Sequence, residues 1–294
     1  MDAAHVKERQ TPKIVLATHG GCSARGASRL ASLLAQRAGA EIDVVGVLAP
    51  VPPMDSGFGL IYPPSEGMEQ ELEKQIEIGI AEQLAHCGLV ACQPKVRLGQ
   101  PAIEIAAAAR TAGAALIVLG LGPHHAVDRA LAGETALQLV QVASTPVLAA
   151  PVSADMLPRR ALVAIDFTPT SMAVAQTVGR VMADDGIVEL VHVSHERHRS
   201  STTEVERRLS QLADAIASGP LSLRTQVSVV FGAPAPTLLD MARSHGVDVI
   251  ALGSHGYGLW KRLTIGSVAS KIIRLAEVSV LVQPLGSVVA TSTA

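Results

Sequence analysis

The sequence predicts an α/β protein made of two tandem, doubly wound domains. Three observations predict this fold class. The chain of 294 residues is longer than one domain of about 100–200 residues, one series of landmarks occurs twice, and short β-branched runs alternate with helical windows. Hydrophobic residues make up 48% of the chain and charged residues 17%, which suffices for two buried cores and excludes a disordered chain.

The repeat consists of apolar runs that recur in the same order. Residues 14–17 have a counterpart at residues 162–165, 148 positions later, whereas residues 116–120 match residues 249–253 at an offset of 133. A Gly-x-Pro element and a last apolar strand also recur at the offset of 133. Because the runs recur in the same order, they indicate a tandem duplication. The offset falls from 148 to 133 along the chain, so the first copy contains about 15 extra residues.

Proline and glycine mark the extra residues and the ends of the copies. Residues 49–64 hold five prolines and two glycines, which predicts a loop, because proline removes hydrogen-bond donors and glycine adds backbone freedom. Residues 151–158 are interpreted as a linker. We therefore expect one domain at residues 10–151 and a second at residues 159–285, followed by a frayed tail.

Within each copy the elements alternate in the order expected of βαβ units. The second strands are expected at residues 44–47 and 188–193, and the following helices at residues 68–84 and 204–217. The first of these helices carries an apolar residue at every fourth position, which predicts one apolar stripe. Each copy continues with a strand ending in Gly-x-Pro, a helix, a strand ending in glycine, a loop, a helix and a last strand. This alternation implies a parallel sheet, which binds ligands beyond the carboxyl ends of its strands.

Composition excludes several classes of function. A net charge of −2 and an aromatic content of 2% argue against nucleic acid as a partner, because cationic charge and stacking platforms are both scarce. The most apolar stretch, residues 102–122, carries Glu104 and Arg110 and breaks at Gly113, so no membrane span is expected. Residues 1–11 lack the apolar core of a signal peptide, and the three cysteines lack CxxC spacing, which together indicate the cytoplasm.

A glycine-framed loop in the second copy is the most informative stretch of the chain. Gly253 ends a buried strand, Gly256 permits a turn with positive φ, and Gly266 precedes Ser267 at the start of a helix. Unpaired N–H groups and the macrodipole at a helix start favour a phosphate. Ser267 adds a hydroxyl donor, and the Lys261-Arg262 pair supplies positive charge. Glycine between a strand and a helix can also serve turning alone.

The spacing Gly253-x-x-Gly256, nine residues, Gly266-Ser267 resembles the ATP-binding signature of the universal stress protein family. Asp166, directly after the first strand of the second copy, resembles that family's nucleotide-contacting aspartate, although it can also serve as a loop cap. The segment at residues 191–193 resembles the family's second strand, whose final valine meets adenine through its backbone. The resemblance covers nearly the whole chain, once per copy.

What the resemblance implies is a five-stranded parallel sheet flanked by helices in each domain, the adenine nucleotide alpha hydrolase-like fold. It also implies ATP bound between the aspartate, the valine and the glycine loop. No acidic cluster in the sequence fixes a metal, but Mg²⁺ can arrive with the nucleotide. The nucleotide-binding residues that it implies are Ile165, Asp166, Val193, Gly253, His255, Gly256, Gly266, Ser267 and Val268.

The first copy departs from this pattern at three positions. Pro123 takes the place of the second glycine, and proline has no N–H to donate. Glu134 takes the place of the serine, where a carboxylate at a helix N-terminus would repel a phosphate. Thr18 takes the place of the aspartate. We therefore expect a degenerate nucleotide site in the first domain and an intact one in the second.

The resemblance also suggests dimerisation through the last strand of each domain. In a tandem chain, residues 147–149 can pair with residues 280–282 within one molecule, so we expect an intramolecular pseudo-dimer; a homodimer of two chains stays open.

Histidines at positions 124–125 and 192–198 lack further ligands at metal-binding spacing, so no metal site is assigned. Cys87 and its neighbour at position 92 are interpreted as redox-active or as unremarkable thiols.

Three hypotheses for function follow. The first is an ATP-binding regulator of the stress response whose surface is read by an unknown protein partner. The second is a slow ATPase or nucleotidyl-transfer enzyme of the same fold, although the sequence offers no evident base for activating water and no catalytic residue is assigned. The third is an interaction module in which both sites are vestigial.

Overall fold

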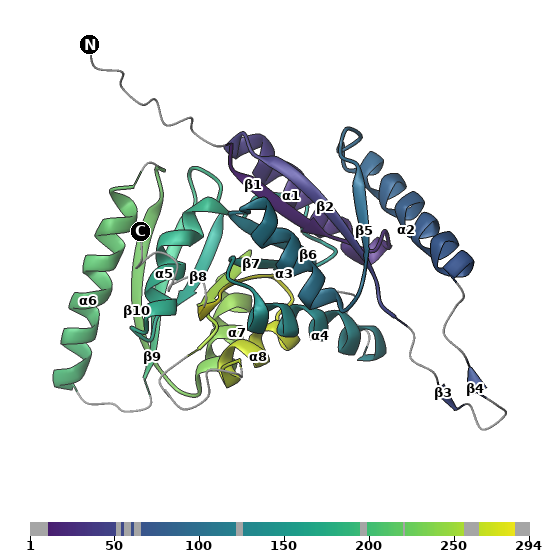
Figure 1. The fold of residues 1–294 in the computed structure, drawn as a ribbon. Coiled ribbons are helices and arrows are strands. Elements are labelled where there is room, and N and C mark those ends of the chain that lie inside the picture. The colour runs from purple at the N-terminus through teal and green to yellow at the C-terminus, as the bar shows by residue number, and fades with distance from the viewer. Residues whose placement is uncertain are drawn as a thin grey trace, which may run out of the picture.

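The computed structural model describes residues 11–50, 54–55, 60–61, 66–121, 126–194, 199–219, 221–255 and 265–285. It shows a mixed α/β protein in which helices flank a central, mostly parallel sheet (Figure 1). The first half contains β1 (Lys13–Ala17), η1 (Cys22–Ala24), α1 (Arg25–Ala38), β2 (Glu41–Leu48), β3 (Met54–Asp55), β4 (Leu60–Ile61), α2 (Glu66–His86), β5 (Pro94–Leu98), α3 (Pro101–Ala112), β6 (Leu116–Gly120), α4 (Ala126–Val142) and β7 (Val147–Ala150). The second half contains β8 (Arg160–Ala164), α5 (Pro169–Thr177), η2 (Val178–Arg180), β9 (Ile187–Ser194), α6 (Arg199–Ala217), β10 (Arg224–Phe231), α7 (Pro234–Ser244), β11 (Val249–Gly253), α8 (Ser267–Leu275) and β12 (Ser279–Gln283).

The two halves repeat one strand order and meet in a single ten-stranded sheet. The order is β10-β9-β8-β11-β12 in the second half and, continuing across the sheet, β7-β6-β1-β2-β5 in the first. Within each half neighbouring strands are parallel, as the alternation of strands and helices predicted. Gly99 and Gly232, in the two Gly-x-Pro elements, have φ angles of 152° and 150°, so even this turn is copied.

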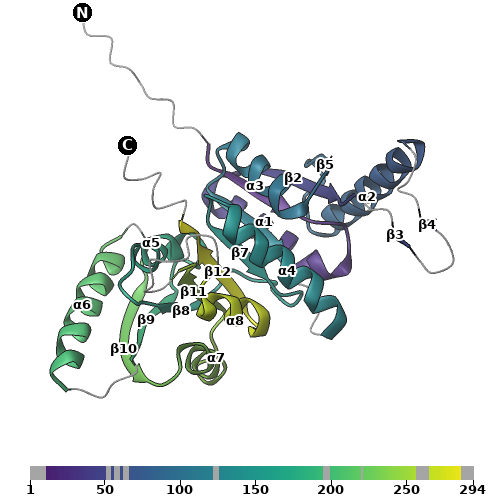
Figure 2. The same ribbon diagram turned by 60° about the horizontal axis from the view of Figure 1, so that its bottom comes forward.

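An antiparallel pairing of the last strands joins the halves, as expected for residues 147–149 and 280–282. Val280 lies opposite Ala149, Leu281 opposite Leu148, and Val282 opposite Val147. Figure 2 shows β7 and β12 side by side at the centre of the molecule. The edge that each five-stranded sheet would expose on its own is thereby paired within the chain.

Two apolar layers cover the two faces of the sheet, and each layer runs through both halves. Helices α3, α4, α7 and α8 contribute to one layer, and helices α1, α2, α5 and α6 contribute to the other. Because each layer contains side chains from both copies, the core is shared between the halves. Among the described helices, none is both long enough and apolar enough to cross a membrane.

Two expectations for the first copy need correction. The stretch predicted as a plain loop at residues 49–64 contains the antiparallel pair β3 and β4. The apolar stripe of α2 is only half used: Ile80 and Leu84 are buried, whereas Met68 and Leu72 are exposed. Figure 1 shows the reason, since the start of α2 extends beyond β5, the edge strand of the sheet, and has no strand beneath it.

The pairing of β7 with β12 predicts that the two halves unfold together. Leu281 and Leu148 face each other across this joint and are both fully buried, so Leu281→Ala should lower the free energy of unfolding by about 2–5 kcal/mol. Urea denaturation should still show a single transition. The control Val90→Ala removes an exposed side chain and should change stability by less than about 0.5 kcal/mol. Two separate transitions, with only one of them shifted, would contradict the shared core.

Candidate functional site

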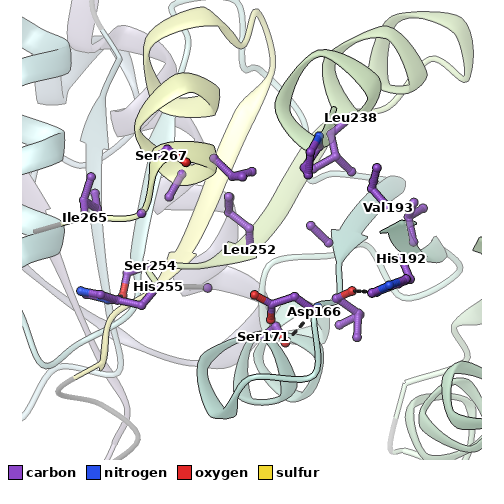
Figure 3. Close-up of a pocket in the computed structure, with 18 of the residues that line it drawn as sticks. Asp166, Ser171, His192, Val193, Leu238, Leu252, Ser254, His255, Ile265 and Ser267 are labelled. Atoms are coloured by element: carbon purple, nitrogen blue, oxygen red, sulfur yellow. Dashed lines mark hydrogen bonds between the residues drawn. The ribbon is translucent and has the colours of Figure 1, made fainter. Parts of the chain in front are cut away.

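A cavity of about 600 Å³ lies in the second half at the carboxyl ends of β8, β9 and β11. The strand order reverses here, because β9 and β11 lie on opposite sides of β8, and ligands of doubly wound sheets bind at such switch points. The start of α8 and the first turns of α7 complete the wall, and Figure 3 shows Leu238 of α7 across the cavity from Asp166. The volume suits a small organic ligand, since such pockets measure about 300–1,000 Å³.

Eight of the nine residues that the resemblance implied line this cavity. They are Ile165, Asp166, Val193, Gly253, His255, Gly266, Ser267 and Val268. The ninth, Gly256, lies outside the described residues, as do Lys261 and Arg262. The tertiary structure therefore brings together residues that lie up to 103 positions apart in the chain, from Ile165 to Val268.

Asp166 caps a turn and lines the cavity at the same time. Its Oδ1 atom accepts hydrogen bonds from the backbone N–H of Thr168 at 3.0 Å and from the Thr168 hydroxyl at 2.6 Å. The cap hypothesis and the site hypothesis for this aspartate are thus compatible, because one oxygen serves the turn. No described residue donates a hydrogen bond to the second oxygen, Oδ2, which leaves it able to accept one from a ligand.

The threonines that build this wall were not among the predicted site residues. Thr168 is the N-cap of α5, and Pro169 is its first residue, a pairing that marks helix starts and was readable in the sequence. Thr170 donates its hydroxyl hydrogen to the backbone oxygen of His255 at 3.0 Å. The start of α5 is thereby fixed to the residues that follow β11.

Gly253 is required by this packing. A Cβ atom at this position would lie 2.4 Å from the hydroxyl oxygen of Thr170 and 2.9 Å from the backbone nitrogen of Ser171. No side chain fits at that separation, so only glycine lets the end of β11 approach α5 this closely. The glycine that the motif assigned to the ligand therefore has a structural role as well.

The N-terminus of α8 presents backbone donors at the cavity. Gly266 precedes the helix in an extended conformation, with φ −62° and ψ 148°, and its N–H donates to the oxygen of Ser254 at 2.8 Å. The first intrahelical bond runs from Ser270 N–H to the oxygen of Gly266. The N–H groups of residues 267–269 have no partner among the described residues, and no acidic side chain lies in this first turn. Such a helix start attracts an anion.

Two histidines border the site and differ in what they bind. His192 lies 2.7 Å through Nδ1 from the backbone oxygen of Ile165, and because a carbonyl only accepts, this Nδ1 carries a hydrogen. His255 lies 2.8 Å through Nδ1 from the hydroxyl of Ser254. The rest of the lining is largely apolar and comes from Val193, Leu238, Leu252, Ile265 and Val268.

In the described part of the first copy, no helix begins at the position that matches Ser267. The helix α4 begins at Ala126, so Gly133 and Glu134 lie well inside a continuous helix. The expectation that Glu134 occupies a helix N-terminus is therefore wrong. Its exposed carboxylate instead lies 3.4 Å from the guanidinium of Arg274 in α8, across the junction between the halves. Pro123 lies outside the described residues.

The expected equivalence of Thr18 with Asp166 is also wrong, by one residue. In the sheet, Ile14 pairs with Leu116 as Ala161 pairs with Val249, which sets the offset between the first strands at 147. Hydrogen bonding agrees, because Thr18 N–H and Ile165 N–H both donate to the neighbouring strand just past the end of their own. His19 is thus the counterpart of the aspartate. The error arose because an apolar run matches its copy almost equally well at either offset.

The two neighbouring thiols of the first half are poorly suited to redox chemistry. Burial raises the pKa of both Cys87 and Cys92 above the ordinary value, even though Arg29 and Arg25 act in the opposite direction on Cys87. A raised pKa lowers the fraction of thiolate, which is the reactive form. The structure favours unremarkable thiols.

The fold is that of a tandem α/β protein with a cavity at the switch point of its second half. The model of the universal stress protein family matches residues 11–151 and 158–284. The chain belongs to the universal stress protein family and is a tandem two-domain member of it.

Solved structures share the fold over nearly the whole chain. A universal stress protein from Archaeoglobus fulgidus DSM 4304 is 19% identical with a TM-score of 0.64, over 92% of this chain and 96% of that one. A putative universal stress protein from Pseudomonas aeruginosa UCBPP-PA14 is 14% identical with a TM-score of 0.60, over 96% of each chain. No curated protein sequence matches this chain. At these identities the likeness shows the tandem fold.

The packing at the end of β11 predicts that Gly253→Ala destabilises the second half. The new Cβ atom would push against Thr170 and the start of α5, so we expect a loss of about 1–3 kcal/mol in the free energy of unfolding. The matched control is Gly67→Ala in α2, where a Cβ atom meets nothing within 4 Å and helix propensity favours alanine. Chemical denaturation measures both variants. Equal stability of the two would contradict the close approach.

Proposed function

We propose that this chain is a cytoplasmic, ATP-binding regulator of the stress response that binds one nucleotide in the cavity of its second half. The observation that carries the proposal is the meeting of Asp166, the end of β9 and the start of α8 around one cavity at the switch point of the sheet. An acceptor, an apolar wall and an array of backbone donors are the three surfaces that a nucleotide needs.

The polarity of the cavity supports one orientation of the ligand. The phosphates are assigned to the N–H groups at the start of α8, because a helix N-terminus favours negative charge. The base is assigned to the apolar wall and the backbone at Val193, and the nucleoside end to Asp166, as the family resemblance implies. A negative carboxylate beside the phosphates would be unfavourable, which supports placing Asp166 at the other end. Mg²⁺ would arrive with the nucleotide.

The difference between the halves supports a stoichiometry of one. We propose a nucleotide-binding domain at residues 159–285 and a degenerate domain at residues 10–151. In the first domain α4 extends over the positions where the second domain has the start of α8, and a histidine replaces the aspartate. Neither the anion-binding helix start nor the carboxylate is then available there.

The position of α8 supports a regulatory role for the nucleotide. Its first turn borders the cavity, and Arg274 in its last turn pairs with Glu134 of the first domain. A ligand that restrains the start of this short helix thereby acts on an element that spans the junction between the domains. A protein partner that reads this junction would sense whether the cavity is filled.

The proposal predicts that calorimetry gives one ATP per chain and that Ser267→Glu weakens binding at least about tenfold. A carboxylate at the first position of α8 suits the helix dipole, so the fold should persist, but it repels the phosphates. The control Ser210→Glu makes the same exchange on an exposed part of α6, outside the lining of the cavity, and should leave the affinity unchanged.

Three outcomes would contradict the proposal. Two nucleotides per chain would show that the first domain also binds. No heat of binding for the unaltered chain would favour the hypothesis of vestigial sites. Linear release of phosphate faster than about 1 s⁻¹ with ATP and Mg²⁺ would favour an enzyme instead of a regulator.

A further inference from the structure

The turn after the first strand of each half contains a residue in the left-handed region. In the first half this residue is Gly20, with φ 80°, and in the second it is Phe167, with φ 60°. The two positions correspond at the offset of 147 that the sheet register sets. Glycine adopts this conformation freely, whereas a bulky residue is strained in it, and Phe167 alone among the described non-glycine residues has positive φ. Contacts with neighbouring side chains must therefore offset the strain of Phe167 in this conformation.

The helix packed against this turn differs between the halves in a matched way. A Cβ atom on Gly20 would lie 2.5 Å from the carbonyl carbon of Gly79, so in the first half α2 rests directly on the turn. In the second half the guanidinium of Arg208, from α6, lies 3.8 Å from the centre of the Phe167 ring. A glycine pair with touching backbones is thus replaced by a cation stacked on an aromatic ring.

The Phe167 ring also reaches the candidate site. Its centre lies 5.5 Å from that of the His192 ring, at a tilt of 34°. The same imidazole donates from Nδ1 to the backbone oxygen of Ile165, directly before Asp166. Figure 3 shows this bond beside the cavity. The residues on both sides of Asp166 are therefore restrained by one stack that runs from Arg208 through Phe167 to His192.

We infer that Phe167, held between Arg208 and His192, is a positioning residue that keeps Asp166 in the geometry that binds the nucleotide. The inference rests on the proposed function. Ring contacts outweigh the strain at Phe167 and select one conformation of the turn, in which no described residue donates a hydrogen bond to the second carboxylate oxygen of Asp166. A ligand can donate to that oxygen in this conformation. A turn that samples other conformations would bind more weakly in proportion to the time spent in them.

Two arginines that are adjacent in α6 provide a matched test. Arg208→Ala and Arg207→Ala each remove one positive charge from α6, but Arg208 stacks on Phe167, whereas Arg207 pairs with Glu204. We expect Arg208→Ala to weaken ATP binding about threefold in calorimetry and Arg207→Ala to leave it unchanged. If the two substitutions have equal effects, Arg208 acts through its charge alone and not through its stacking on Phe167, and the inference is overturned.

The ring itself is tested by Phe167→Gly, which installs the residue of the first half and tolerates the left-handed turn. This variant should bind ATP about tenfold more weakly than the unaltered chain. The separate variant Phe167→Tyr, which keeps the ring, should bind ATP within about twofold of the unaltered chain. Unchanged affinity in the glycine variant would overturn the inference, because the turn would then need no stack.

Hydrogen exchange in the nucleotide-free chain separates this inference from the proposed function. The amide of Thr168, bonded to Asp166, should exchange faster in Phe167→Gly and Arg208→Ala than in Arg207→Ala. The ¹⁵N shifts of His192 should show the hydrogen on Nδ1 in the unaltered chain and lose that preference in the glycine variant. If these signals change but the unaltered chain gives no heat with ATP, the restraint of the turn is supported and the proposed function fails. Unchanged signals in every variant would overturn the positioning role.

Discussion

The antiparallel contact between β7 and β12 is the interaction on which the rest of the structure depends. Three residue pairs connect two five-stranded sheets into one, and the two apolar layers then continue across the joint. Without this contact each half would expose the edge of its last strand and the apolar side chains that now pack across the joint. Hydrogen bonds between the halves reinforce this joint away from the strands. The guanidinium of Arg37, in α1, donates to the backbone oxygens of Gly179 and Arg180, in η2, at 3.1 and 2.8 Å.

The joint also explains how the two halves could diverge. Strands, core layers and the Gly-x-Pro turns are repeated because both halves must fit the same central sheet. The halves differ in the segments that follow β1 and β8 and in the helices that follow β6 and β11. The first half has a longer α4 and a turn that touches Gly79, whereas the second has the cavity described above, the start of α8 beside it and the Phe167 stack. Segments at the ends of strands can change without altering the sheet, so two halves with one scaffold can differ there.

Much of the fold and of the candidate site could be predicted from the sequence. Apolar periodicity and turn glycines are local signals, so the duplication and the order of elements were readable without coordinates. The partner strands of the joint were implied by the family resemblance. The motif spacing placed Gly253, Gly266 and Ser267 near one ligand, and the structure gathers them around one cavity. The structural demand for Gly253 was not readable, because it arises from Thr170, which is 83 positions away in the chain.

The sequence by itself determined the class of fold, the two copies and the residue types available at the end of each strand. Only the tertiary structure decided that His19 and not Thr18 matches Asp166, that Glu134 lies inside a helix, and that Phe167 adopts a left-handed turn. The physical reason is common to all three. Strand register, helix bounds and a strained turn depend on the free energy of contacts between segments distant in the chain, which neighbouring residues do not encode.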